Sequence, residues 1–359
     1  MSRRTLALER SPAALDIVSH GRRGPGSRTF LSPAQVAQVA RTVHGVPEVV
    51  VKVSGGARDC VGARGHFDYI DRHGRLPIET DEGVELAGRD TGQQLVEDWN
   101  LALSRGQYRP RPAQGAADRR PKLVHNIVLS MPGRTPAQAV LRAARVFARE
   151  HFSAQHRWAL VLHTDRQHPH VHLVVKAEQE YEPQRRLHVT KALLRSWRED
   201  FAAALREQGV AANATPAALR GRPRSGQSAS LQRWVRAAGS GMRQPDGDRA
   251  AKPPPRVSPA LRAKVEVVAS ELLRGRFEPP PGKARLQATR QAVERSWLGV
   301  AAALQAQGEA ALADDVRRFV QELPAVRTEQ EQIAAALLAH ACASRQAQQE
   351  RPAPRARDG

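Results

Sequence analysis

The chain has 359 residues, and its 56 lysines and arginines against 36 aspartates and glutamates give a formal charge of +20. This excess of positive charge favours a polyanionic partner, first nucleic acid and second an anionic membrane surface. Two cysteines exclude a disulfide framework and a multi-cysteine zinc site. No apolar run approaches the ~20 residues of a membrane span, and none of signal-peptide length opens the chain, so we expect no membrane insertion and a cytoplasmic location.

The charge is unevenly distributed along the chain. Residues 101–150 contain 10 basic and 2 acidic residues, and 201–300 contain 18 and 7, whereas 51–100 contain 6 and 10. A single run of charge is usually a solvated surface. Two separate basic stretches in one chain, 101–150 and 201–300, favour a different interpretation, namely a surface that binds phosphates.

The first predicted elements are an arm, a helix, a strand and a second helix. Residues 1–31 are rich in Gly and Arg, which indicates a flexible basic arm. Ser32, with a proline after it and Gln35 three positions on, has the pattern of a capping box that begins a helix. The β-branched run 49–53 predicts a buried strand, and residues 62–72 can form a helix.

The middle of the chain predicts an antiparallel sheet. Leu123–Leu129 is predicted to be a strand, and Thr135–Gln138 repeats the capping-box pattern before a helix. Trp158–Leu162 and Val171–Lys176 are two further strands joined by a turn, and an amphipathic helix runs from Thr190 to Gln208. Because a hairpin pairs its strands antiparallel, we expect an α+β fold with an antiparallel central sheet and helices packed on one side of it.

The domain boundaries follow from composition. Residues 32–211 hold the predicted sheet and form one folded domain. Residues 212–258 are rich in Arg, Gly, Ser and Pro, which is typical of a basic linker. Residues 259–345 are rich in Ala, Leu, Arg, Gln and Glu and predict three or four helices, and 346–359 are expected to be a disordered tail.

The strongest chemical signal is a group of histidines around one predicted turn. His170 and His172 point to the same face of a strand because side chains alternate along it, and His163 ends the preceding strand. Three imidazoles on adjacent strands suit a catalytic metal site. Asp165 is close enough to orient a ligand histidine. His168 is either a substrate contact or a bystander, because a proline separates it from the strand.

Three histidines do not define a reaction by themselves, since zinc hydrolases, dioxygenases and nucleases all use such sets. A metalloprotease of the helical type is disfavoured because no H-E-x-x-H motif occurs. Further motifs narrow the choice, and one of them contains Tyr69. They are Lys52–Gly56, Gly65–Gly74 with Tyr69, Leu76–Gly83 and Ile127–Pro132.

Together with the histidine hairpin, these motifs resemble the conjugative relaxases, or mobilization nucleases, of the HUH endonuclease superfamily, in their single-tyrosine MOB-P-like type. The resemblance covers about residues 30–215 in the family's order. It implies that Tyr69 attacks the scissile phosphate of single-stranded DNA at a transfer origin and is joined to the 5′ phosphate. The ends are rejoined later, during conjugative mobilization. Tyr181 is the alternative nucleophile.

The resemblance also implies a cofactor. The family typically uses Mg²⁺ or Mn²⁺, which His163, His170 and His172 would hold and Asp165 would support. Imidazole ligands would equally suit Zn²⁺. Residues expected to contact DNA are Ser130, Arg109, Arg111, Arg119, Arg120, Lys122 and His168.

The partners implied are single-stranded and transfer-origin DNA, accessory relaxosome proteins and the coupling protein of a type IV secretion system. A relaxase acts in the bacterial cytoplasm and can follow the DNA into the recipient cell. The host element can be a plasmid or an integrative element. Because no P-loop motif occurs, unwinding would need another protein.

Three other functions are open. Another HUH enzyme, a replication initiator or transposase, is disfavoured because the segments between Val49 and Gly83 match the relaxase order. A non-catalytic DNA-binding accessory protein is disfavoured by the intact histidines and Tyr69. An unrelated metal hydrolase is disfavoured by the pI near 11.3.

Overall fold

The computed structural model describes residues 30–104, 110, 118–165, 167–221, 259–278, 280 and 282–349. The chain divides into two compact units, one formed by Ala40–Thr215 and one by Met1–Val39 with Pro216–Gly359. Most of the predicted arm, linker and C-terminal tail lies outside the described residues, and residues 346–349, expected to belong to the disordered tail, are helical.

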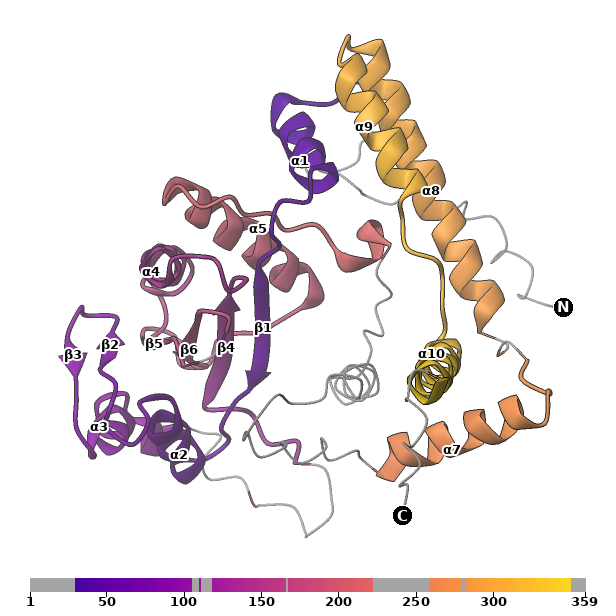
Figure 1. Ribbon diagram of the computed structural model, residues 1–359. Coiled ribbons are helices and arrows are strands. Elements are labelled where there is room, and N and C mark those ends of the chain that lie inside the picture. The colour runs from indigo at the N-terminus through magenta and orange to yellow at the C-terminus, as the bar shows by residue number, and fades with distance from the viewer. Residues whose placement is uncertain are drawn as a thin grey trace, which may run out of the picture. The chain divides into compact units, whose positions relative to one another are not determined.

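The unit Ala40–Thr215 is built on a six-stranded sheet with the strand order β1-β4-β6-β5-β2-β3 (Figure 1). Every pairing between neighbouring strands is antiparallel, which confirms the predicted α+β fold. The strands are β1 (Val50–Gly55), β2 (Ile78–Thr80), β3 (Glu85–Leu86), β4 (Val124–Ser130), β5 (Trp158–His163) and β6 (His170–Lys176).

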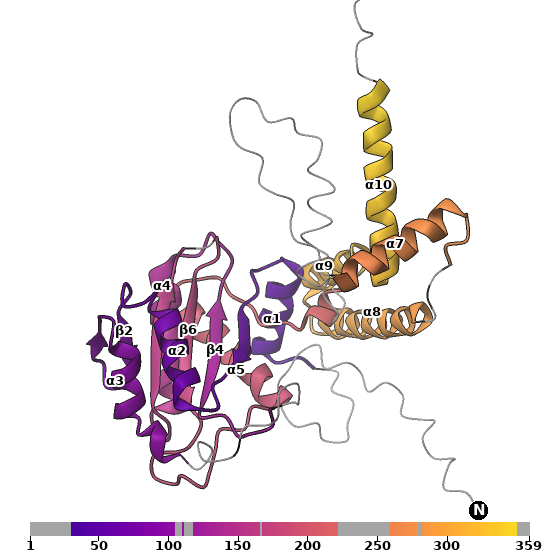
Figure 2. The same ribbon diagram turned by 90° about the horizontal axis from the view of Figure 1, so that it is seen from below.

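Helices cover both faces of this sheet, so the prediction of helices on one side was wrong (Figures 1 and 2). One core packs α4 and α5 against β1, β4 and β6, and the other packs α2 and α3 against β5 and β6. The strand β6 is buried along its whole length, because Val171 faces α4 and α5 while Val174 faces α2 and α3. The helices of this sheet are α2 (Cys60–Ile70), α3 (Thr91–Asp98), α4 (Ala137–Phe152) and α5 (Lys191–Glu207).

One of the two predicted capping boxes is present in the structure. The helix α1 (Pro33–Val43) begins with the expected capping box, in which Ser32 N–H donates to Gln35 Oε1 and Gln35 N–H donates to Ser32 Oγ. The Thr190 hydroxyl caps α5 by accepting from Leu193 N. The capping box predicted at Thr135–Gln138 is absent, because α4 begins one residue later than expected and Pro136 is its N-cap.

The acidic stretch before residue 100 contains elements that the pattern did not predict. The two short strands β2 and β3 form a hairpin that extends the sheet beyond β5, with Glu79 opposite Leu160. A 3₁₀ turn over Leu101–Leu103 follows α3. Strands of two and three residues are too short for a period of two to be visible in the sequence.

The other unit is mostly helical over its described residues, as predicted. A 3₁₀ turn, Ala217–Arg220, precedes four helices, α7 (Pro259–Leu273), α8 (Lys283–Ala306), α9 (Ala310–Gln321) and α10 (Glu329–Gln349). The helices α8 and α9 pack together, and α10 packs on α7. Among the described residues, no helix has the length and apolar character needed to cross a membrane.

Candidate active site

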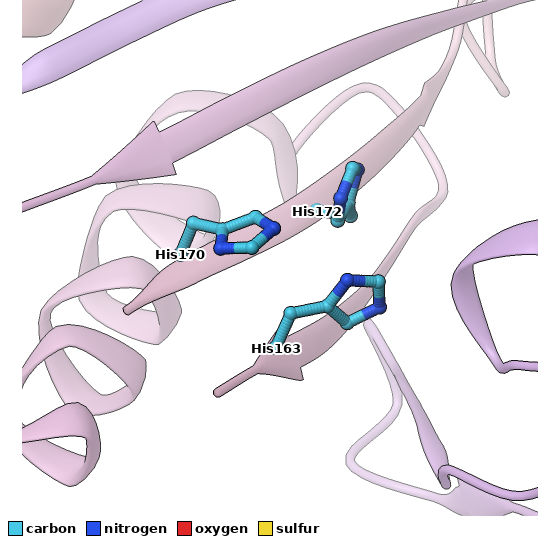
Figure 3. Close-up of side chains that lie close together, drawn as sticks. All are labelled: His163, His170 and His172. Carbon is cyan, nitrogen blue, oxygen red and sulfur yellow. The ribbon is translucent and has the colours of Figure 1, made fainter. Parts of the chain in front are cut away.

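Three buried histidines meet on the face of the sheet that α2 and α3 cover. His163 at the end of β5 is paired with His170 at the start of β6, and His172 follows two residues later. Their ring centroids lie 5.1 Å (His163–His170), 4.5 Å (His163–His172) and 5.2 Å (His170–His172) apart. One nitrogen from each ring lies within 4.8 Å of the others, and the rings lie close together, edge-on or tilted to one another (Figure 3). The three imidazoles therefore lie together, as the alternation of side chains along the strands predicted.

Backbone carbonyls orient two of these rings. His170 Nδ1–H donates to the carbonyl of His168 at 3.0 Å, which leaves the lone pair on Nε2. His163 Nε2–H donates to the carbonyl of Ile70 at 2.6 Å, which leaves the lone pair on Nδ1. Among the described residues, His172 Nδ1 is buried without a hydrogen-bond partner. Such second contacts fix the tautomer of a metal-binding histidine, so the three rings fit a divalent cation.

Burial favours the neutral form of two of the three rings. It lowers the pKa of His163, and together with the neighbouring His163 and His170 it lowers the pKa of His172 to about 3. Neutral imidazoles have free lone pairs at neutral pH, which metal binding requires.

Tyr69 lies beside this cluster on the last turn of α2. The helix is capped by Asp59, whose side chain accepts from Gly62 N, and buries Phe67 and Ile70 against the sheet. This packing places the Tyr69 ring centroid 6.2 Å from that of His172, with 46% of the residue exposed. The fold therefore brings the predicted nucleophile to the predicted metal ligands.

Two residues that the sequence did not single out complete the site. His66 lies one turn before Tyr69, and its ring stacks on Tyr69 at 6.1 Å and contacts His172 edge-on at 6.4 Å. Burial lowers the pKa of His66 to about 4. The three-residue helical spacing from Tyr69 was a signal that could have identified it. Arg72 lies beyond the helix, where no periodicity applies.

Asp165 reaches the cluster through Arg72. Its carboxylate accepts a hydrogen bond from Arg72 Nη2 at 2.6 Å, and the same nitrogen donates to His163 Nδ1 at 3.2 Å. We expected Asp165 to orient a histidine itself, and the structure places a guanidinium between the two groups. The alternative nucleophile, Tyr181, is 88% exposed in the segment after β6.

The predicted DNA contacts fall into two groups. Ser130, at the end of β4, is paired with His170 across the sheet, and His168 and Arg119 are exposed. Arg120 instead pairs with Asp118 at 2.8 Å and Asp59 at 3.2 Å. Lys122 Nζ donates to the carbonyl of Gly55 at 2.9 Å. Arg109 and Arg111 lie outside the described residues.

Residues 88–209 match the family model of the MobA/VirD2-like relaxase nuclease domain. This segment, about a third of the chain, is similar to the relaxase nuclease domains. The match includes the three histidines and Ser130 and begins after Tyr69, so the tyrosine's place in the site rests on the packing of α2. The MOB-P subtype stays a prediction.

Two curated proteins are similar to this chain. The T-DNA border endonuclease VirD2 of Rhizobium radiobacter is 26% identical over 137 residues, which are 36% of this chain and 31% of the relative. The protein of the same name from Agrobacterium fabrum (strain C58) is 26% identical over 138 residues, 36% of this chain and 30% of the relative. The chain thus matches less than a third of the length of these relatives.

Proposed function

We propose that the chain is a site- and strand-specific DNA relaxase that nicks single-stranded DNA at a transfer origin during conjugative mobilization. The observation that supports this most directly is the Tyr69 ring beside three buried histidines, 6.2 Å from the ring of His172. The matched relaxase nuclease segment, 88–209, supports a nicking endonuclease. A tyrosine and a metal-binding cluster in contact are the parts that phosphoryl transfer to a protein oxygen needs.

In this reaction the Tyr69 oxygen forms a bond to the scissile phosphorus and the bond from phosphorus to the 3′ oxygen breaks. The phenolic proton is lost to solvent, and the departing 3′ oxygen takes up a proton to become a hydroxyl. The product is a 5′-phosphotyrosine. Because this bond conserves the energy of the phosphodiester, attack by a 3′ hydroxyl rejoins the strand without a nucleotide cofactor.

His163, His170 and His172 would hold a divalent cation, Mg²⁺ or Mn²⁺ in the first place and Zn²⁺ as the alternative. Such a cation supplies positive charge that stabilises the phosphate in the transition state. The carbonyls of Ile70 and His168 keep two of the rings in the tautomers this requires. Imidazole-only ligation suits Zn²⁺ and Mn²⁺ better than Mg²⁺, which prefers oxygen.

We further propose that residues 32–211 form the nuclease domain, with Ser130, His168 and Arg119 beside the bound strand, together with Arg109 and Arg111. The contacts of Arg120 and Lys122 within the protein assign them to shaping the segment before β4. Accessory relaxosome proteins and a secretion coupling protein are the partners that such an enzyme needs, in the cytoplasm of a donor cell.

The test uses the full chain, an origin-bearing single-stranded oligonucleotide and Mg²⁺ or Mn²⁺. We expect a covalent protein–DNA adduct that resists denaturation in a gel and disappears in Tyr69→Phe. Tyr181→Phe is the matched control and should form the adduct at the wild-type level, because Tyr181 is largely exposed in another segment. An adduct of wild-type yield from Tyr69→Phe would refute the assignment of the nucleophile.

A further inference from the structure

Arg72 is the residue that connects the nucleophile to the histidine cluster. Its Cζ lies 5.3 Å from the Tyr69 ring centroid, and its Nη2 contacts both His163 Nδ1 and Asp165. Its backbone has a φ of 57°, in the left-handed region. Few residues other than glycine adopt this conformation, and it is concentrated at functional sites. The turn after α2 directs the guanidinium back over the last turn of the helix.

The contact with His163 involves the nitrogen that a metal would need. A neutral imidazole has one protonated nitrogen and one lone pair. His163 Nε2–H donates to the carbonyl of Ile70, so its lone pair is on Nδ1, which accepts from Arg72. The ring lies close to those of His170 and His172, edge-on to the first and tilted to the second (Figure 3). One lone pair cannot serve a guanidinium and a metal ion together.

We propose that Arg72 and the metal ion compete for His163 Nδ1, and that metal binding releases Arg72 to bind the scissile phosphate next to Tyr69. This inference rests on the proposed nicking function. Asp165 keeps the released guanidinium at the site through their 2.6 Å contact. A phosphate is the ligand that best suits a planar guanidinium. A bound phosphate would also lie between the metal ion and the Arg72 guanidinium, two positive charges that would otherwise repel each other.

The competition makes metal and DNA binding cooperative. Each ligand favours the state in which Arg72 has left His163, so each raises the affinity of the protein for the other, by linkage. An Arg72 that only stabilised the turn would behave differently. Its removal would change the thermal stability and leave the affinity for the metal as it was.

The experiment measures Mn²⁺ affinity by calorimetry on the full chain, with and without a single-stranded thymidine oligonucleotide. The Tyr69→Phe background prevents nicking. Without DNA, Arg72→Met should bind Mn²⁺ about tenfold more tightly than the Tyr69→Phe parent, the size of one hydrogen bond from a charged donor. The oligonucleotide should raise Mn²⁺ affinity in the parent and leave it unchanged in Arg72→Met.

Arg64→Met is the matched control. Arg64 is on α2, the helix that ends just before Arg72, and lies 3.8 Å from Asp68, so its loss also removes one positive charge near α2. It should bind Mn²⁺ like the parent, and His170→Ala should not bind. If Arg72→Met does not fold, as judged by circular dichroism, Arg72→Gln takes its place and should also gain affinity.

Equal or weaker Mn²⁺ binding by the Arg72 variants would refute the competition, and so would a parent that binds no Mn²⁺. The outcome is separable from that of the proposed function, because nicking is scored with Tyr69 intact. If the wild type forms the adduct and the Arg72 variants gain no Mn²⁺ affinity, the nicking function is supported and the competition is refuted. A gain of Mn²⁺ affinity in the Arg72 variants without an adduct in the wild type would support the competition and refute the nicking function.

Discussion

His125 is a half-buried histidine away from the histidine cluster, and it should make the stability of the nuclease unit depend on pH. It lies on β4, with Nε2 3.2 Å from the carbonyl of Leu187 and Nδ1 buried without a partner among the described residues. Burial first, and then the nearby charge of Lys122, lowers its pKa from 6.5 to about 4. Because the unfolded state binds more protons between these two values, stability is present above the unfolded pKa and is lost as pH falls toward the folded one.

The size of the loss follows from the two pKa values. Between pH 7 and pH 5, this single group should lower the free energy of unfolding by about 2 kcal/mol. His125→Gln keeps an N–H donor for the Leu187 carbonyl and has no proton to gain, so it should lose this part of the pH dependence.

Urea denaturation at pH 7 and pH 5 measures the effect as a difference of differences, which cancels the contribution of other groups. His188→Gln is the matched control, because His188 is exposed and its removal takes no buried imidazole from the fold. If wild type and His125→Gln lose the same stability between the two pH values, the lowered pKa of His125 inferred from the structure is refuted.

Three further outcomes are expected. His170→Ala should abolish metal-dependent cleavage, and unchanged cleavage would take His170 out of the ligand set. Arg119→Ala removes an exposed cation, so the slope of log affinity for single-stranded DNA against log salt should fall by about 0.7, with an unchanged melting temperature. Arg120→Ala should lower the melting temperature in a thermal scan and keep the salt slope, because its guanidinium pairs with Asp118 and Asp59.

The parts of the site that depend on local periodicity were predictable. His170 and His172 are two apart on one strand and His163 is across one hairpin, so alternation alone places the rings together. The resemblance to relaxases led to Tyr69, whose distance from His172 depends on how α2 packs. The packing of α2 was not predictable from a sheet with helices on one side only. In the structure α2 packs on the other face of the sheet, where β6 is also buried.

Arg72 shows where sequence reasoning stops. A helix period would place a residue three positions after Tyr69 on the same face, but the helix has already ended at Ile70. Arg72 returns to the site only because two successive residues, Arg72 and His73, have φ values of 57° and 58°. Left-handed conformations at residues other than glycine have no strong signal in a single sequence.

The structure also changes how the distribution of charge along the chain is interpreted. Acidic residues outnumber basic ones in 51–100, the stretch that contains Tyr69, which would oppose a phosphate if they were free. Arginines from later stretches pair with several of them. The pairs are Arg120 with Asp59, Arg145 with Glu79, and Arg157 with Asp81 and Asp98.

Each of these ion pairs neutralises one basic and one acidic side chain within the protein. Arg120 and Arg145 belong to the strongly basic stretch 101–150, so part of its excess neutralises the protein's own carboxylates instead of DNA. Near the nucleophile, the cation in contact with the Tyr69 ring is Arg72. A phosphate approaching Tyr69 therefore meets the three histidines and a guanidinium already held by Asp165, and the field it experiences depends on which partner occupies His163 Nδ1.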